Sequence, residues 1–310
     1  MRVFVTGGAG FIGSYLIPEL LERGYEVGVF DVKTNPVLLN PISSRIVYLQ
    51  GDLGRVDQLW GAIEKFHPDG IMHLGAILAG LCEENPRRCF DVNFGSTQVL
   101  LDACLKFRIN KFFMTSSVSV FGRDVPEPVV DSASKNPGNV YGQTKLASEH
   151  LLLWYARTFG IDACAIRPTL VFGHGRTTGI TALFTAKLLD AIARNEEVKV
   201  ANPDLKGDWL YVKDVVQAIL AIWNAKLTNQ RVFNIAGSVH STREVIEIAK
   251  AACPGARVSY DQESENPTPY AVAFDDSPAR KELGYKPAYT IETAVEEHIE
   301  IVQKKARGKL

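Results

Sequence analysis

The 310-residue sequence has no excess of charge of either sign and no long hydrophobic run. The 34 lysines and arginines offset 35 aspartates and glutamates, and no block of like charge stands out, so nothing indicates a nucleic-acid-binding face. No apolar run reaches membrane-spanning length, and Met1-Arg2 leads into an apolar strand without a signal segment. We therefore expect a soluble cytoplasmic protein that contacts neither nucleic acid nor membrane.

Cysteine is also scarce. The five cysteines, at positions 82, 89, 104, 164 and 253, are scattered, odd in number and without metal-ligand spacing. We interpret them as free, mostly buried thiols and expect no metal site. Internal repeats are absent, and a chain of this length buries roughly three quarters of its unfolded surface, enough for one large domain or two unequal ones.

A glycine-rich turn after the first strand is the strongest signal in the chain. Residues 2–6 are apolar and β-branched, and they lead into Gly7-Gly-Ala-Gly10-Phe-Ile-Gly13. In such a turn Gly7 permits the tight bend, Gly10 leaves backbone N–H groups open to a pyrophosphate, and Gly13 lets the next helix pack closely. The pattern predicts a strand, a phosphate-binding turn and a helix.

The residues that follow supply the context that a lone glycine pattern lacks. Helical spacing runs through residues 15–23, Gly24 ends it, and a second strand over 25–30 leads to Asp31. An acid at the end of that strand accepts hydrogen bonds from the adenosine ribose and repels a 2′-phosphate, which favours NAD over NADP. The alternative is a solvated acid, and nearby Lys33 weakens the preference for NAD.

Strands and helices continue to alternate through the first half of the chain. This pattern predicts a parallel sheet with helices on both faces and ligands at the carboxyl ends of the strands. His73 lies in an apolar strand and is expected in the core, whereas Asp52 either flanks an adenine or caps a helix. The expected strands are 45–50, 70–74, 111–115 and 231–236, and the expected helices are 56–66, 90–107 and 140–159.

Tyr141 and Lys145 share one face of a predicted helix because they are four residues apart. A tyrosine hydroxyl has a pKa near 10, and a nearby ammonium lowers it by favouring the phenolate. Lowering that pKa to about 7 requires roughly 4 kcal/mol. Alone the pair would be unremarkable, but after a dinucleotide-binding pattern it indicates acid–base chemistry on a substrate hydroxyl.

Together these motifs resemble the extended short-chain dehydrogenase/reductase family, which contains the NAD-dependent epimerases and dehydratases. The resemblance covers nearly the whole chain. Besides the glycine turn and Asp31, it rests on Asp52-Leu53, Asn93, Thr115-Ser-Ser-Val-Ser-Val-Phe-Gly122, Tyr141-x-x-x-Lys145, Arg167-Pro168, Asp208-Trp-Leu-Tyr-Val-Lys-Asp214 and 276–287.

The resemblance implies NAD as cofactor and a role for each motif. Tyr141 would be the general acid or base, Lys145 would hold the nicotinamide ribose, and Ser117 would bind the substrate oxygen, with Ser116 and Ser119 as alternatives. Asn93 matches an asparagine that is more structural than chemical. The expected cofactor contacts are Gly7, Gly10, Phe11, Ile12, Gly13, Asp31, Asp52, Leu53, Leu74, Ala76, Asn93, Tyr141 and Lys145.

Several positions depart from the family's subgroups. Family dehydratases resemble one another in an Asp-Glu pair where this chain has Val118 and Ser119. Nucleotide-sugar epimerases typically have an asparagine and an arginine, both contacting the diphosphate, where Leu170 and Gly207 stand. Unless Lys206, Arg176 or His174 replaces these contacts, the sequence favours a dehydrogenase acting on a smaller hydroxy compound. The stretch from His73 to Asn93, with Ala76-Ile-Leu and Glu83-Glu-Asn-Pro86, looks more like the branch that dehydrogenates threonine or sugar acids.

The remaining expectations concern architecture and substrate. We expect an α/β Rossmann-type doubly wound parallel sheet over 1–166 plus about 205–237, and a smaller, interleaved substrate domain over about 167–204 plus 238–310. Apolar residues beyond one face of helices 90–107 and 140–159 predict a homodimer, with burial inside one chain as the alternative. The expected substrate contacts are Leu78, Ser117, Thr169, Phe172 and Arg176, and Arg176 suits an anionic group.

Three functions remain open at this point. The first is NAD-dependent oxidation of a secondary alcohol in a sugar, sugar acid or hydroxy acid. The second is epimerisation of a nucleotide sugar, such as a UDP-hexose at its 4-position, through transient oxidation. The third is a non-enzymatic dinucleotide sensor, which the intact Tyr141 and Lys145 pair disfavours.

Overall fold

A seven-stranded parallel sheet forms the larger part of the molecule, as the sequence predicts. The computed structural model describes residues 1–226, 230–261 and 271–308. The strand order is β10-β6-β5-β4-β1-β2-β3, and every pair in this sheet is parallel. The strands are β1 (Arg2–Thr6), β2 (Glu26–Asp31), β3 (Ile46–Gln50), β4 (Gly70–His73), β5 (Lys111–Thr115), β6 (Asp162–Pro168) and β10 (Val232–Ile235).

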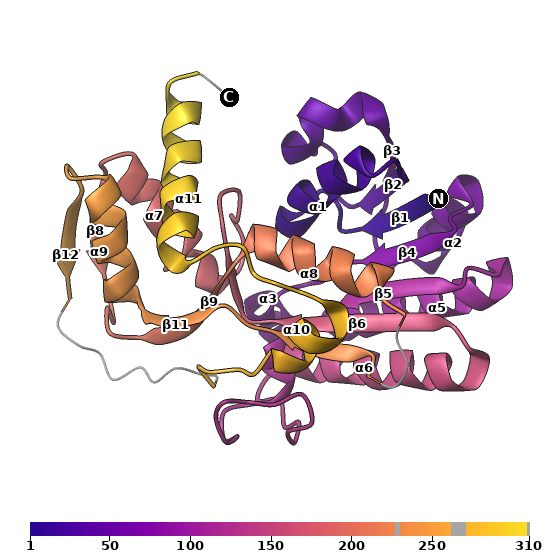
Figure 1. Ribbon diagram of the computed structural model, residues 1–310. Coiled ribbons are helices and arrows are strands. Elements are labelled where there is room, and N and C mark those ends of the chain that lie inside the picture. The colour runs from indigo at the N-terminus through magenta and orange to yellow at the C-terminus, as the bar shows by residue number, and fades with distance from the viewer. Residues whose placement is uncertain (227–229, 262–270, 309–310) are drawn as a thin grey trace.

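Helices cover both faces of this sheet, so it is doubly wound (Figure 1). On one face α2 (Val56–Phe66), α5 (Ser96–Phe107) and α6 (Val140–Phe159) pack together, and on the other α1 (Phe11–Glu22) packs against α8 (Val212–Asn224). Successive side chains of a strand point to opposite faces of the sheet, so β1 contributes residues to the hydrophobic core on each face. Val3 and Val5 belong to the core under α1 and α8, while Phe4 packs with Phe30 and Phe66 under α2.

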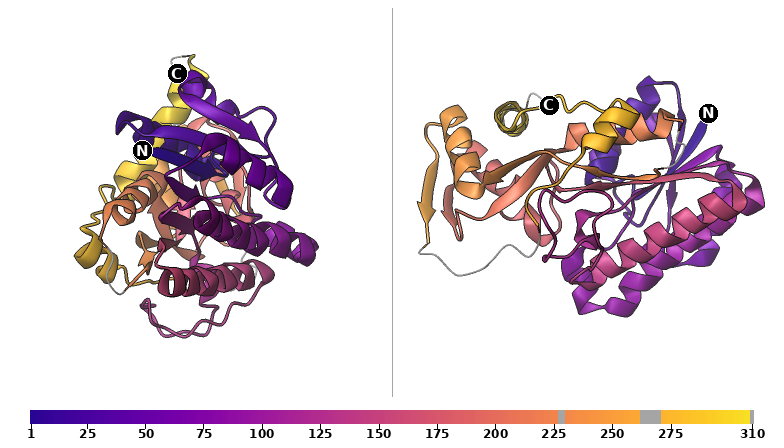
Figure 2. Two further views of the ribbon diagram at one scale, coloured as in Figure 1. Left: turned by 90° about the vertical axis from the view of Figure 1, so that its right-hand side faces the viewer. Right: turned by 60° about the horizontal axis from the view of Figure 1, so that its bottom comes forward.

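The second part of the molecule holds two small sheets beside the carboxyl ends of the large one (Figures 1 and 2). One contains β7 (Leu170–Phe172), β9 (Lys206–Tyr211) and β11 (Ser238–Ser241), and the other pairs β8 (Glu197–Val200) with β12 (Arg257–Tyr260). The longer helices here are α7 (Ala186–Ala193), α9 (Thr242–Ala252) and α11 (Ile291–Ala306). The remaining helical elements of the described residues, from both parts of the molecule, are η1 (Val37–Arg45), α3 (Ala79–Glu84), α4 (Pro86–Cys89), η2 (Phe90–Gly95), η3 (Val118–Val120), η4 (Ile180–Ala182) and α10 (Ser277–Leu283).

Chain connectivity interleaves the two parts. The chain leaves the large sheet after β6, builds β7 to β9, and returns for β10. The division expected from the sequence assigned residues 206–211 to the dinucleotide-binding part, whereas β9 is hydrogen-bonded to β7 and β11. Positions 227–229, 262–270 and 309–310 of the expected domains lie outside the described residues. No helix in the described ranges is long and apolar enough to cross a membrane.

Two local expectations need correction. The helix expected over 90–107 begins with a π-helical segment, η2, and becomes α-helical only at Ser96. Asp52 does not cap α2, because that helix begins at Val56 without a side-chain cap. Asp52 accepts a hydrogen bond from the Gly54 N–H (2.8 Å) and pairs with Arg88 instead.

Buried polar contacts attach helix α6 to the sheet. The Lys145 Nζ donates to the Thr115 carbonyl at the end of β5 (2.8 Å). One turn further along, Glu149 accepts two hydrogen bonds from Arg167 of β6, at 2.8 Å from Nε and 2.7 Å from Nη2. The side chains of both partners are at most 4% exposed. Because neither charge reaches solvent, each depends on the other for solvation.

His73 is a core residue, as its apolar strand predicts. It is 2% exposed and hydrogen-bonded to Thr6 (2.6 Å) and Ser96 (3.2 Å). Burial, reinforced by the charge of Lys145, lowers the pKa of His73 to about 3. The imidazole is therefore neutral in the folded protein at pH 5, whereas in an unfolded chain, with a pKa near 6.5, it is protonated.

This difference predicts a loss of stability in mild acid. As the pH falls below about 6.5 the unfolded chain takes up a proton that folded His73 refuses until about pH 3, so the free energy of unfolding falls. Between pH 8 and pH 5 the loss from this group is about 2 kcal/mol. Urea unfolding of His73→Gln should show a correspondingly smaller change between the two pH values. The exposed His150 offers the control, because His150→Gln should retain the wild-type change.

The buried Glu149–Arg167 pair leads to a second prediction about the stability of the fold. Glu149→Gln removes the closer of the two carboxylates that face the buried guanidinium and leaves only Asp131, 3.7 Å from Nη1, which we expect to cost about 3 kcal/mol in the free energy of unfolding. Glu300→Gln is the matched control, because Glu300 forms an exposed pair with Lys304 in α11 and its loss should cost less than about 1 kcal/mol. Equal effects of the two substitutions in urea unfolding would refute the anchoring role of Glu149.

Candidate active site

The glycine-rich turn after β1 is built by close backbone contacts. A Cβ on Gly7 would lie 2.4 Å from the Cα of Gly75, and one on Gly13 would lie 2.3 Å from the carbonyl oxygen of Gly8. Gly7 also has a positive φ of 67°. A Cβ on Gly10 would approach only the Gly7 oxygen, at 3.0 Å. Gly7 and Gly13 therefore serve packing, while Gly10 leaves open the cavity above the turn.

Helix α1 begins at this turn and faces a cavity of about 440 Å³. Gly10 precedes its first turn and provides no side-chain cap, so the first-turn N–H groups remain for a ligand. Gly10, Phe11, Ile12 and Gly13 all line the cavity. Such a helix N-terminus is suited to a phosphate, because N–H groups and the helix dipole both favour negative charge there.

Asp31 lines the same cavity, next to the glycine-rich turn and at the end of β2. It is 8% exposed, and its two carboxylate oxygens accept hydrogen bonds from the backbone N–H groups of Ala9 (3.0 Å) and Lys33 (3.1 Å). The Lys33 ammonium donates to the Ala9 carbonyl at 2.6 Å. The carboxylate is thereby held against the cavity wall, in the position that suits a ribose.

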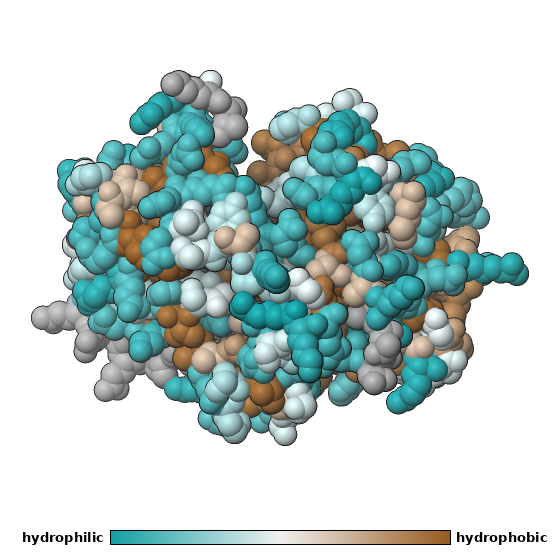
Figure 3. Space-filling view, in the orientation of Figure 1, coloured by the Kyte–Doolittle hydropathy of each residue, from teal (hydrophilic) through white to brown (hydrophobic). Residues whose placement is uncertain are grey.

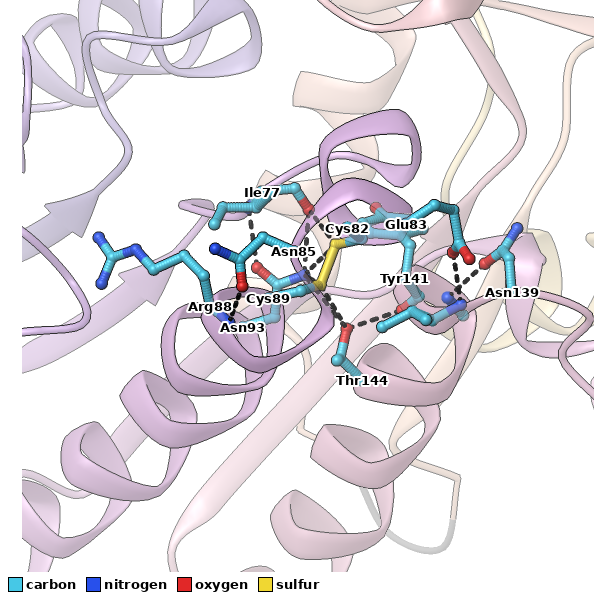
Figure 4. The surroundings of a disulfide bond; sticks show 12 residues. Ile77, Cys82, Glu83, Asn85, Arg88, Cys89, Asn93, Asn139, Tyr141 and Thr144 are labelled. Atoms are coloured by element: carbon cyan, nitrogen blue, oxygen red, sulfur yellow. Dashed lines mark hydrogen bonds between the residues drawn. A yellow bond between two sulfur atoms is a disulfide. The ribbon is translucent and has the colours of Figure 1, made fainter.

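The structure brings nearly all of the expected cofactor residues to this cavity. Those that line it are Gly7, Gly10, Phe11, Ile12, Gly13, Asp31, Asp52, Leu53, Leu74, Ala76, Tyr141 and Lys145. Asn93 does not line it. Its side chain is buried, accepts from the Ile77 N–H (2.8 Å) and donates to the Ile77 carbonyl (3.0 Å) and to Thr144 (3.1 Å). Asn93 thus ties the segment after β4 to helix α6, as Figure 4 shows.

A disulfide bond next to Asn93 corrects the expectation of free thiols. Cys82 of α3 and Cys89 of α4 are bonded, while Cys104, Cys164 and Cys253 are free and buried as expected. The two short helices meet at Asn85 and fold back, which brings the Cα atoms of the pair to 5.0 Å (Figure 4). The spacing of seven residues does not show this, because it depends on that change of direction.

Tyr141 lies where the first cavity joins a second one of about 610 Å³. Leu78, Thr169 and Arg176 line both cavities as well. The Lys145 Nζ lies 5.8 Å from the centre of the Tyr141 ring. Burial lowers the pKa of Lys145 to about 8, opposed by the charge of Glu149, so the ammonium is charged at neutral pH. A fixed positive charge beside a tyrosine hydroxyl favours the phenolate.

The three candidate serines occupy different surroundings. The Ser116 hydroxyl donates to buried Glu149. The Ser117 hydroxyl donates to the Ser119 hydroxyl (3.0 Å) and accepts from the Ser119 N–H (3.1 Å). Ser116 lines the smaller cavity and Ser119 the larger one, whereas Ser117 lines neither of the two. Which of the three serines binds the substrate oxygen stays a prediction.

Two other residues that were candidates for the substrate pocket lie elsewhere. Phe172 is 1% exposed and packs edge-on against Trp209, so it belongs to the core. His174 forms a cluster with Asp190 of α7 and His298 of α11, and Tyr15 donates to its carbonyl. Hydrogen bonds from both histidines hold the pKa of Asp190 well below its ordinary value despite burial. This cluster attaches α11 to α7.

Sequence reasoning missed most of the walls of the larger cavity. They include Phe184, Leu188, Val198 and Val200, which come from α7, β8 and the segment before α7. It also missed Arg88, which lines the smaller cavity and pairs with Asp52. No local signal identifies these residues, because segments far apart in the sequence assemble the walls.

Comparisons with known proteins agree with this geometry. The NAD dependent epimerase/dehydratase family matches residues 3–236. A 3 beta-hydroxysteroid dehydrogenase/Delta 5-->4-isomerase of Mycobacterium tuberculosis is 30% identical, with 96% of this chain and 89% of that protein covered. A UDP-glucose 4-epimerase of Corynebacterium glutamicum is 26% identical, with 96% and 94% covered.

A solved structure shows the same fold. The UDP-glucose 4-epimerase of Thermus thermophilus, in complex with NAD, superposes with a TM-score of 0.86 at 24% identity, and all of both chains is covered. The open turn at Gly10, the uncapped N-terminus of α1 and the carboxylate of Asp31 fit the pyrophosphate and ribose of that cofactor. The chain is therefore an enzyme of the NAD dependent epimerase/dehydratase family, with NAD as its cofactor.

Proposed function

We propose that the protein is an NAD-dependent dehydrogenase of a secondary alcohol. The observation that carries this proposal is the position of Tyr141 at the junction of two cavities, one lined by the glycine turn and Asp31, the other free for a substrate. Lys145 lies beside Tyr141 and is held by the Thr115 carbonyl. An alcohol in the larger cavity can therefore reach both the tyrosine hydroxyl and the cofactor site.

Each residue has a defined task in this proposal. Bound NAD supplies the hydride acceptor for the alcohol carbon. The Tyr141 phenolate accepts the proton of the substrate hydroxyl, and the Lys145 ammonium stabilises that phenolate. The Ser117–Ser119 pair supplies a hydroxyl for the same substrate oxygen. The substrate loses one hydride and one proton and becomes a ketone.

Leu170 and Gly207 favour a dehydrogenase over a nucleotide-sugar epimerase. Both line the larger cavity, at the positions where the family resemblance leads us to expect an asparagine and an arginine that contact a diphosphate. A Cβ on Gly207 would lie 3.0 Å from the Leu170 Cδ2, so the leucine side chain covers the backbone of Gly207. The charge-assisted contacts that a diphosphate needs are missing there.

The names of two relatives bear on this choice. The mycobacterial relative is named a dehydrogenase, which supports oxidation of an alcohol as the net reaction. The corynebacterial relative is named a UDP-glucose 4-epimerase, and this keeps epimerisation as the second candidate. A dehydratase of the Asp-Glu type is disfavoured, because Val118 and Ser119 occupy those positions beside the cavity.

Removal of the Tyr141 hydroxyl tests the mechanism. With NAD and an accepted alcohol, Tyr141→Phe should lower kcat by about 100-fold or more, because no group then accepts the proton. NADH absorbance measures the rate, and Tyr48→Phe is the control, since Tyr48 OH donates to the Lys33 carbonyl and does not line the substrate cavity. Unchanged turnover in Tyr141→Phe would reject the mechanism. Inversion of UDP-glucose without net NADH would instead select the epimerase.

A homodimer is a further proposal, supported by an apolar strip on the outer face of α5 and α6. This strip comprises Leu105, Leu153, Trp154 and Phe159, which are 38 to 47% exposed. The face in Figure 3 is, by contrast, mostly hydrophilic. Light scattering should give twice the chain mass of 34.1 kDa for the wild type and for Val239→Glu in β11, and the single mass for Trp154→Glu. A monomeric wild type would reject the proposal.

Location in the cytoplasm is also a proposal. The near-neutral charge of the sequence supports it. Disulfides are rare where thiol pools are reducing, so the Cys82–Cys89 bond has to survive there. Both cysteines have no exposed surface, which shields the bond from reductants.

A further inference from the structure

We infer that the substrate is a secondary alcohol with a bulky apolar body, and that Leu170 is a main determinant of this preference. The inference rests on the proposed dehydrogenase function and names its substrate class. It follows from what lines the larger cavity, from where its polar groups lie, and from what occupies the place of the expected diphosphate contacts.

The walls of the larger cavity are mainly aliphatic and aromatic. Its volume of about 610 Å³ is that of a site for a ligand with several rings, well above the need of a small hydroxy acid. The apolar groups come from several segments that are far apart in the sequence. The main ones are Leu78, Leu170, Phe184, Val198, Leu205 and Phe274.

The polar residues that line the cavity form two sets by their place in the chain. Ser119, Thr169 and Arg176 line it together with Tyr141, and the other set, from β8, β9, α9 and the segment between the two strands, includes Lys199, Asn202, Lys206 and Thr242. Thr169 donates to the carboxylate of Asp208 (3.0 Å), which also accepts from the Gly237 N–H (2.6 Å), so these groups already bind one another. In the proposed reaction the ligand hydroxyl lies at Tyr141, and its carbon body lies along the apolar walls.

The cations of the cavity do not replace the missing diphosphate contacts. The guanidinium of Arg176 donates to the Val171 carbonyl and the Thr181 hydroxyl, at the junction with the cofactor cavity. Lys199 and Lys206 are exposed, and Lys199 is paired with Asp261. His174, the remaining candidate, lies in the cluster with Asp190 and His298. A diphosphate in the interior would therefore compete with Val171 and Thr181 for Arg176, and it would meet Lys199 and Lys206 only where these side chains are exposed to solvent.

Leu170 makes the apolar wall continuous at that point. It extends over Gly207, whose lack of a side chain leaves room for the leucine, with 3.0 Å between the Leu170 Cδ2 and a Cβ built on Gly207. The two residues lie on adjacent strands, β7 and β9, and only Leu170 presents a side chain to the ligand. A large residue at position 207 would displace it. Leu170 and Gly207 therefore give this wall an apolar surface at the positions where the asparagine and arginine of an epimerase would give a polar one.

A matched set of alcohols tests the inference on the full-length wild type. NADH formation is measured with cyclohexanol and with decahydro-2-naphthol, which presents the same secondary alcohol on a larger hydrocarbon. If the walls bind the body of the substrate, kcat/KM should be at least about tenfold higher for decahydro-2-naphthol. Equal values would overturn the inference and leave the proposed dehydrogenase function intact.

The Leu170→Asn variant tests the assigned residue. It should lower kcat/KM for decahydro-2-naphthol by about tenfold, change that for cyclohexanol by less than about threefold, and leave the Kd for NAD unchanged. The Kd should not change because Leu170 does not line the cofactor cavity. The control is Val239→Asn, an exposed position of β11 outside both cavities, which should behave as wild type. An equal loss for both alcohols in Leu170→Asn would contradict the assignment.

Binding provides a readout that does not depend on turnover. Titration calorimetry of the NADH-loaded protein with the ketone decahydro-2-naphthone should give a Kd at least about tenfold below that for UDP-glucose. Tighter binding of UDP-glucose would overturn the inference. If it is also inverted without net NADH, the proposed dehydrogenase function fails together with the inference.

Discussion

The site depends on the attachment of one helix, α6, to the end of the central sheet. Two buried polar contacts provide that attachment, Lys145 to the Thr115 carbonyl and Glu149 to Arg167. A buried charge without a partner is costly, so these contacts define a single position of the helix along the strands. That position sets where the Tyr141 hydroxyl lies relative to both cavities. The packing of helix α6 therefore also fixes the position of Tyr141 between the two cavities.

The lysine has two effects at once. Its hydrogen bond orients α6 beside Tyr141, whose ring centre lies 5.8 Å from the Nζ. Its charge contributes to the low pKa of His73, which stays neutral within the core. Burial brings the pKa of Lys145 itself down to about 8, so the charge on which these effects depend begins to be lost in mildly alkaline solution.

The segment after β4 links the cofactor cavity to the substrate cavity. Leu78 lines both, Asn93 binds the backbone of Ile77, and the Cys82–Cys89 bond closes the short helices in between (Figure 4). Asn93 also reaches Thr144 in α6, one turn from Tyr141. Through these contacts the segment and helix α6 are held together, so Asn93, which lines neither cavity, supports the wall between them.

The sequence alone determined the parallel sheet, the glycine-rich turn, the acid at the end of β2 and the Tyr141–Lys145 pair. Each is a local pattern, in which strand period, glycine spacing or helical spacing places the groups without reference to distant residues. Only the tertiary structure decided that Asn93 supports rather than lines the cavity, that Phe172 is core, that Cys82 and Cys89 are bonded and that Asp52 pairs with Arg88. It alone also decided the character of the substrate cavity. Leu78, Leu170, Phe184 and Val198 meet there because separate strands and helices converge, and no periodicity within one segment records which segments will become neighbours.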